Sequence, residues 1–177
     1  MRLDQAFSDS FTRFPDSPAI IEGNRACTYS QLHARVERLA GALASRGVSS
    51  GDHVVYVSAN STVFAELTLA CSRIGAVCEI HNIRLSDQTL LELIARSGAS
   101  LAVLSADAWD RLGPHLPSSG SIETTVVFGH EEDLLDDAIP YEEFLEGAPA
   151  PPNQKPADDE DPVLMMFTSC LLYTSDA

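Results

Sequence analysis

The hydrophobic residues follow two different spacings along most of the chain. Between positions 29 and 47 they recur every three or four residues, as at Leu32, Val36 and Leu39, which is the period of one helix face. Residues 54–57 instead form a continuous β-branched run, as expected of a strand that is buried on both faces. The pattern therefore predicts helices and buried strands in alternation.

The same alternation continues to about residue 128, and residues that cap or stop helices mark its boundaries. Ser86 is a suitable N-cap for a helix through residue 97, and Gly75 and Gly98 are suitable helix stops, because glycine adopts the left-handed conformation that often ends a helix. Helices are expected over 29–47, 62–74 and 87–97, strands over 54–57, 76–80, 99–104, 125–128 and 163–167, and a short segment around Trp109.

Apolar strands that alternate with amphipathic helices are typical of a parallel sheet covered on both faces. Right-handed crossovers between such strands produce a doubly wound layer. The sequence therefore predicts an α/β fold with a parallel, doubly wound sheet, which residues 1–129 would form as one amino-terminal subdomain.

The pattern breaks down after residue 129. Residues 131–161 contain twelve acidic residues and one lysine, a net charge of −11, and the proline-rich stretch GAPAPPNQKPADDED. Only PYEEFLEG suggests a short helix. Residues 130–161 are therefore expected to be an acidic, proline-rich, exposed linker, after which residues 162–169 return to the core as a strand.

Composition limits the function classes. The 177-residue chain carries a formal net charge of −15 and is 45% hydrophobic, which favours a globular protein and argues against a nucleic-acid or anionic-membrane partner. No apolar run could span a bilayer and the amino terminus lacks a secretory pattern, so a cytoplasmic location is expected.

The four cysteines have no metal-type spacing, and Cys71 and Cys78 are expected to be buried free thiols.

Four segments occur in a recognisable order along the chain: TYSQL (28–32), GVSSGD (47–52), IGAVCEIHNIRLS (74–86) and ARSGASLAV (95–103). Their order and spacing resemble one known family, the adenylate-forming acyl-CoA synthetases (AMP-dependent synthetases and ligases). In addition, DEDPVLMMFTS resembles the approach to the phosphate loop of this family. The resemblance implies that the chain is an amino-terminal fragment of such an enzyme.

The resemblance also implies a reaction. A carboxylic acid would attack the α-phosphate of ATP to give an acyl-adenylate, and coenzyme A would then take the acyl group, with Mg²⁺ offsetting charge. Thr168 and Ser169 match the start of the ATP phosphate loop and are the only candidate site residues. Position 170, where the family has glycine, is Cys170, whose Cβ would oppose the close approach of backbone to phosphate. The fragment itself is therefore expected to be inactive and to have no catalytic or metal-binding residues of its own.

The last eight residues, CLLYTSDA (170–177), resemble a translated sequencing adapter and are expected to be non-native. An alternative register would take Tyr173–Ser175 as the start of the loop, but it would place Asp176 against phosphate and lacks the Asp-Pro entry that precedes Val163. We therefore prefer the register that ends at Ser169.

Several other residues have a structural and a functional interpretation. His81 could line a pocket, but a histidine exposed at a strand end is favoured. Asp52 is interpreted as a turn residue, Asn82 and Arg84 as loop-packing residues, and Trp109 as a core or edge anchor.

Two alternatives to the synthetase fragment remain open from the residues alone. The chain could be a genuine short binding or interaction module that uses its acidic segment and an open sheet edge. It could also be an unrelated flavodoxin-like domain, whose only candidate phosphate site would be the segment that begins at Ser58 and lacks glycine.

Overall fold

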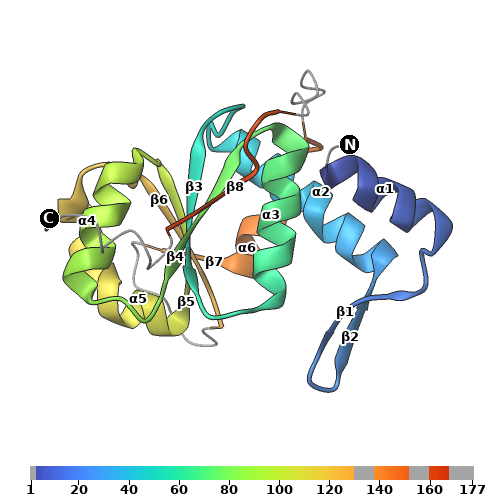
Figure 1. Cartoon of the computed structure of the whole chain (residues 1–177), viewed down its shortest axis with the longest axis horizontal. Helices are drawn as coiled ribbons and strands as arrows, with labels where there is room; N and C mark the ends of the chain where they lie inside the picture. Colours follow the sequence, from blue (N-terminus) through green and yellow to red (C-terminus); the bar gives the residue numbers. More distant parts are fainter. Residues whose placement is uncertain (1–2, 130–137, 152–159, 168–177) are drawn as a thin grey trace, which may run out of the picture.

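A single six-stranded sheet organises the protein. The computed structural model describes residues 3–129, 138–151 and 160–167, and in these residues the strands run in the order β7-β6-β5-β3-β4-β8. Every neighbouring pair is parallel. Helices cover both faces of the sheet (Figure 1), so the predicted α/β class with a parallel, doubly wound sheet is confirmed.

The elements follow the predicted alternation closely. The strands of the sheet are β3 (His53–Ser58), β4 (Val77–Asn82), β5 (Leu101–Ser105), β6 (Thr124–Phe128), β7 (Ile139–Pro140) and β8 (Leu164–Met166). The helices are α1 (Leu3–Arg13), α2 (Tyr29–Ser45), α3 (Thr62–Ile74), α4 (Asp87–Ser97), α5 (Ala106–Leu112) and α6 (Tyr141–Leu145), with a 3₁₀ helix, η1, over Gly113–Ser119.

The chain changes direction across the sheet after β4. It passes from β3 to its neighbour β4, returns to the other side of β3 for β5 and β6, and finally adds β8 beside β4. In this last pair Cys78 lies opposite Leu164. The sheet therefore has β7 at one edge and β8 at the other.

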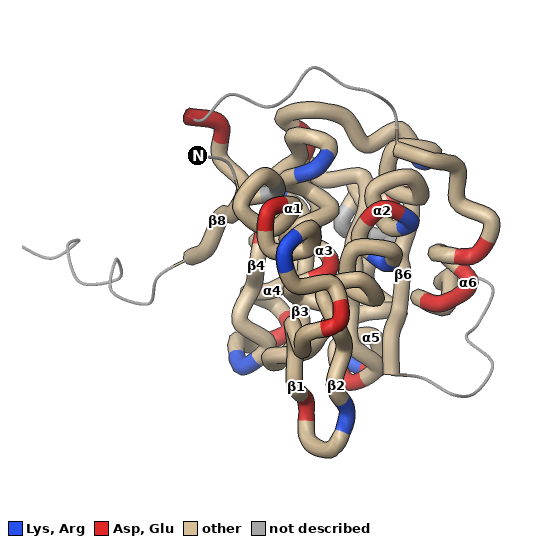
Figure 2. Tube along the Cα trace, turned by 90° about the vertical axis from the view of Figure 1, so that its right-hand side faces the viewer, with Lys and Arg blue, Asp and Glu red and all other residues tan. Residues whose placement is uncertain are grey.

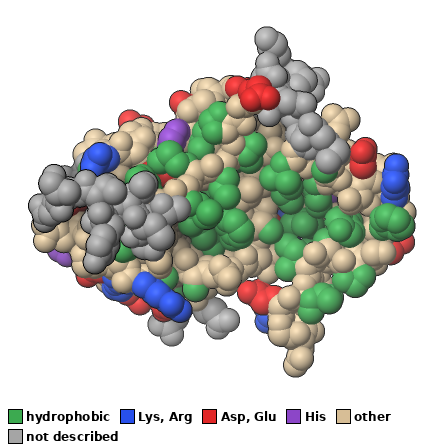
Figure 3. Space-filling view, in the orientation of Figure 1, with side chains coloured by type: hydrophobic (Ala, Val, Ile, Leu, Met, Phe, Trp, Pro, Cys, Tyr) green, Lys and Arg blue, Asp and Glu red, His purple; other side chains and the backbone are tan. Residues whose placement is uncertain are grey.

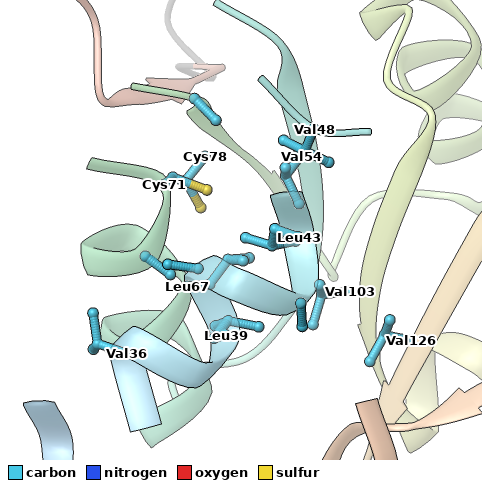
Figure 4. Close-up of a cluster of buried hydrophobic side chains, with 14 of the residues drawn as sticks. Val36, Leu39, Leu43, Val48, Val54, Leu67, Cys71, Cys78, Val103 and Val126 are labelled. Atoms are coloured by element: carbon cyan, nitrogen blue, oxygen red, sulfur yellow. The ribbon is translucent and has the colours of Figure 1, made fainter. Parts of the chain in front are cut away.

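Two hydrophobic clusters lie on opposite faces of the sheet. On one face, α2 and α3 pack Leu39, Leu67 and their neighbours against β3 and β4, as the close-up shows (Figure 4). On the other face, α4 and α5 contribute Leu90 and Leu112 to a second cluster. Successive side chains of a strand point to opposite faces of the sheet, so the strands contribute residues to both clusters.

Cys71 and Cys78 are buried free thiols, as predicted. They point toward each other in the first cluster (Figure 4). The Cys78 thiol, followed by burial, raises the pKa of the Cys71 thiol, so both side chains serve as small apolar residues of the core.

Most predicted helix boundaries are confirmed by their caps, although α2 ends at Ser45, two residues before the predicted end. The Thr28 hydroxyl accepts the backbone N–H of Gln31, whose side chain accepts the backbone N–H of Thr28, which is a capping box at the start of α2. Helix α3 ends at Gly75, where φ is +75°. Because L side chains rarely adopt this conformation, the glycine stop is a local property of the sequence.

The amino-terminal part contains elements that periodicity did not reveal. These are α1 and a two-stranded antiparallel hairpin, β1 (Pro18–Glu22) and β2 (Arg25–Thr28), which projects from the body of the molecule (Figure 1). Phe11 of α1 stacks on His33 of α2 with ring centroids 4.1 Å apart, which holds α1 against the subdomain.

Residues 138–151 correct the expectation of an exposed linker. Strand β7 pairs with β6, and Tyr141, Phe144 and Leu145 of α6 are buried. Pro149 runs so close to α2 that a Cβ on Gly41 would lie 1.8 Å from the Pro149 carbonyl oxygen. Acidic residues of this segment lie on α6 (Figure 2). The buried face of α6 was not predicted, because a five-residue helix is too short to show a hydrophobic period.

Candidate functional site

The carboxyl ends of the parallel strands meet at one edge of the sheet, where ligands of open α/β sheets usually bind. Strand β8 was predicted to lead into a phosphate loop, and the structure places it at the sheet edge beside β4, with the backbone N–H of Cys78 donating to the Val163 carbonyl at 2.9 Å. Thr168 and Ser169, the predicted site residues, lie outside the described residues. The strand that leads to them is present, as predicted, and their own roles stay a prediction.

A buried polar cluster lies next to the end of β8. Glu79 on β4 has no exposed surface, and its Oε2 lies 2.6 Å from Nδ1 of His53 on β3. Its Oε1 lies 3.3 Å from Nε2 of His81. His81 is itself 1% exposed, and its ring stacks on Phe167, with centroids 5.4 Å apart and the planes inclined by 21°.

This cluster lacks a complete set of hydrogen bonds. Glu79 Oε1 and both ring nitrogens of His81 have no hydrogen-bond partner among the described residues; the 3.3 Å contact between them does not have hydrogen-bonding geometry. Burial lowers the pKa of His81, and the neighbouring Glu79 carboxylate partly opposes this shift. Burial therefore favours the neutral form of the ring in the folded protein.

The favoured interpretation of His81 as an exposed strand-end residue is wrong. Strand β4 continues to Asn82, so His81 is still inside the sheet, and Phe167 of the sequence-distant β8 region covers its ring. The two-residue period of a strand already placed His81 on the same face as Val77 and Glu79. The strand partner that buries that face could not be read from the local sequence.

A second buried carboxylate, Glu66 on α3, is fully paired. Arg35 Nε donates to its Oε1 at 2.6 Å and the Tyr141 hydroxyl donates to its Oε2 at 2.6 Å. Arg35 also donates to Glu142, at 3.0 and 2.7 Å. Burial, and then the Glu66 charge, raises the pKa of Tyr141, and the hydrogen bonds from Arg35 lower the pKa of Glu142. This network joins α2, α3 and α6, which is a structural role.

The other residues singled out from the sequence have structural roles. Asp52 Oδ2 accepts the backbone N–H of Ser49, which closes the predicted turn. Asn82 accepts the backbone N–H of Arg84 within the loop that follows β4, and Trp109 packs against the second core cluster. None of these three contacts brings a side chain to the end of β8.

A cavity of about 430 Å³ lies at the other end of the strands, where β6 and β7 begin. Its lining includes Arg46, Trp109, Thr124 and Ile139, and the last two are the first residues of β6 and β7. The cavity is therefore remote from the carboxyl ends of the strands.

Metal and membrane features are absent from the part of the chain that the structure describes. It contains no group of three or more His, Cys, Asp or Glu side chains that could hold a metal ion. Over the same residues no helix combines the length and the apolarity needed to cross a membrane.

Comparison with known proteins identifies the family. The family model described as AMP-binding enzyme matches residues 7–170. A feruloyl-CoA synthase from Amycolatopsis sp. is 33% identical over 155 residues, covering 88% of this chain and 28% of the relative. A peroxisomal acetate/butyrate–CoA ligase from Arabidopsis thaliana is 30% identical over 171 residues, covering 88% of this chain and 30% of the relative. The chain thus spans less than a third of the length of these relatives.

A solved structure supports the same fold. The crystal structure of the anthranilate CoA ligase AuaEII in complex with anthranoyl-AMP superposes with a TM-score of 0.83 at 15% identity, covering 91% of this chain and 31% of that one. The resemblance inferred from TYSQL, GVSSGD and the later segments is confirmed by these matches, and the chain belongs to the AMP-binding enzyme family.

Proposed function

We propose that this chain is the amino-terminal part of an ATP-dependent, AMP-forming acyl-CoA synthetase. The complete enzyme would join a carboxylic acid to coenzyme A through an acyl-adenylate, and we place it in the cytoplasm. Two similar proteins carry names of this activity, a feruloyl-CoA synthase and an acetate/butyrate–CoA ligase, and the related AuaEII structure contains an acyl-adenylate, anthranoyl-AMP.

The observation that carries the proposal is the position of β8. This strand is added to the sheet beside β4 and delivers the chain to the carboxyl edge at Phe167, immediately before Thr168 and Ser169. Hydroxyl side chains and backbone N–H groups at such an edge suit phosphate oxygens. Thr168 and Ser169 would accordingly begin the loop that holds the ATP phosphates.

The 177-residue chain itself is proposed to be inactive. Cys170 stands where the family has a glycine, and the chain spans less than a third of the length of the similar ligases. The segment 170–177 is proposed to be foreign to the natural protein. Residues 130–161 are proposed to connect the subdomain (1–129) with the strand region (162–169), although residues 138–151 pack against the subdomain.

The test begins with the gene. Genomic reads through codon 169 are expected to continue in frame into a Gly- and Thr-rich loop in place of CLLYTSDA. The protein expressed from that longer gene is expected to catalyse carboxylate-dependent ATP–pyrophosphate exchange, which the 177-residue chain should not. Exchange by the short chain, or its absence from the long one with a panel of aliphatic and aromatic acids, would contradict the proposal.

One observation favours a second candidate, a short interaction module. Leu164, Met166 and Phe167 on the edge strand and directly after it are 38%, 60% and 50% exposed, and hydrophobic side chains gather on the face that carries β8 (Figure 3). Open apolar edges of this kind recruit other chains. A native stop codon directly after Ala177 would favour this candidate over the synthetase.

A further inference from the structure

We propose that Glu79 and His81 form a positioning pair that anchors the end of β8, and with it the start of the phosphate loop. The inference rests on the proposed function for the meaning of that loop. Its structural part, the anchoring of β8 by His81, can be tested without any nucleotide.

The attachment of β8 to the sheet is short. Only three residue pairs join it to β4, namely Cys78–Leu164, Glu79–Met165 and Ile80–Met166, and β8 has no strand on its other side within the described residues. Short edge strands of this kind open easily. A contact beyond the last registered pair therefore has a large influence on where the chain leaves the sheet.

The His81 ring provides that contact. It stacks on Phe167 one residue after β8 ends, while Phe167 is otherwise half exposed. Phe167 directly precedes Thr168 in the sequence, so an anchored Phe167 would fix the point from which the predicted loop begins. Placement of phosphate-binding groups has a steep effect on reaction rate, because small displacements reduce the proportion of reactive geometries.

Glu79 holds the ring. Its Oε1 faces His81 Nε2 at 3.3 Å, and its Oε2 is fixed by His53 at 2.6 Å. Among the described residues, Glu79 is the charged group that shifts the pKa of His81. His53 contacts Glu79 and not His81. The other neighbours are uncharged: Met165 and Phe167 from the β8 region, and Leu90 and Ile94 from α4.

The incomplete hydrogen bonding of the pair is the reason to assign it a role. Buried polar atoms without partners are rare in native proteins, and those that persist often serve function. Three such atoms gather here, on two neighbouring side chains of β4. The fully paired Glu66 network shows that this protein can satisfy a buried carboxylate elsewhere.

The experiment uses methionine methyl resonances, because two of the three methionines in the chain, Met165 and Met166, lie on β8. In the 177-residue protein their ¹³C-methyl signals are expected to be distinct from free methionine. His81→Ala should shift both toward the free position, and His81→Phe, which keeps an aromatic ring against Phe167, should restore them. Ile94→Ala, in the same core but away from β8, is the control that lowers stability without moving these signals.

Acidification supplies a readout that a simple packing role would not change. Uptake of a proton by His81 should shift the Met165 and Met166 signals as the pH falls below the ordinary histidine range, and His81→Phe should abolish this titration. The anchoring proposal fails if His81→Ala leaves both methyl signals in place, if Ile94→Ala moves them equally, or if the titration survives in His81→Phe.

The link to the phosphate loop is tested in the protein from the longer gene. There His81→Ala should raise the KM for ATP on the order of tenfold with a smaller change in kcat, and His81→Phe should recover it. An unchanged KM would refute the link even if the methyl data support anchoring. If the unsubstituted long protein shows no exchange at all, the proposed function fails, while the methyl data still decide whether His81 anchors β8.

Discussion

Two glutamates are buried in the described part of this protein, and their surroundings differ. Glu66 is 1% exposed and receives hydrogen bonds from Arg35 and Tyr141. Glu79 is fully buried, meets His53 through one oxygen, and leaves the other without a hydrogen bond among the described residues. A buried carboxylate is costly unless it is paired, so Glu66 is explained by structure and Glu79 needs a further reason.

The difference follows the position of the two residues in the fold. Glu66 lies where α2, α3 and α6 meet, and its partners fasten a distant segment to the subdomain. Glu79 lies beside the edge strand that leads to the expected phosphate loop. If the proposed role of Glu79 and His81 is right, complete pairing marks the carboxylate that holds the fold together, and incomplete pairing marks the one that serves the site.

The largest effect on stability is expected from Arg35→Ala. This change leaves the buried Glu66 carboxylate without its cation, so the free energy of unfolding should fall by about 3–5 kcal/mol, measured by urea denaturation. Arg38→Ala, one turn along the same helix and bonded only to the Ala34 carbonyl in the described contacts, should change it by less than about 0.5 kcal/mol. Equal losses from both substitutions would mean that the Glu66 network contributes no more to the free energy of unfolding than an arginine outside it.

A smaller effect is expected from Tyr141→Phe. The substitution preserves the ring packing against Phe128 but leaves Glu66 Oε2 without its donor, so the free energy of unfolding should fall by about 1–3 kcal/mol. Glu143→Gln on the exposed side of α6 is the matched control and should be near neutral. Tyr141→Phe with no loss of stability would mean that the pairing of Glu66 is unimportant.

The polar pair beside β8 should respond in the opposite way. Replacing both members with apolar residues of similar size, Glu79→Met together with His81→Phe, removes every unsatisfied atom of the cluster, and should leave the free energy of unfolding within about 1 kcal/mol of the original or raise it. A loss as large as that of Arg35→Ala would show that Glu79 is structural after all.

The smallest effect is a pH dependence. Because burial lowers the pKa of His81 in the folded protein, the unfolded chain binds more protons as the pH falls below about 6.5, the ordinary value. The stability contributed by neutral His81 is therefore complete above that pH and is lost on acidification toward the lowered pKa. Urea midpoints between pH 7 and 5 should fall more steeply for the original protein than for the double variant; parallel curves would contradict this assignment.

The sequence predicted the main elements because their signals are local. The apolar stripe of α2, the β-branched run of β3 and the stops at Gly75 and Gly98 each depend on residues within one element. The hairpin, β7 and the burial of α6 were missed, because elements of two to five residues show no period and acquire their burial from distant partners.

The candidate site divides in the same way. The strand that enters the phosphate-loop segment was visible as the apolar run after Asp-Pro, and its return to the core was predicted, whereas its place at the sheet edge came from the structure. Neither the burial of His81 nor its stack on Phe167 could be predicted, since they depend on two strands more than eighty residues apart in the chain being neighbours.

By itself, the sequence determined the α/β class, the order of the main helices and strands, the buried thiols and the family resemblance, because these follow from periodicity, turn residues and segment order. Only the tertiary structure decided which polar residues are buried and which of them are paired. A side chain's solvation depends on what the rest of the chain packs against it, and for Glu66 and Glu79 those neighbours, Tyr141 and β8, come from segments far along the sequence.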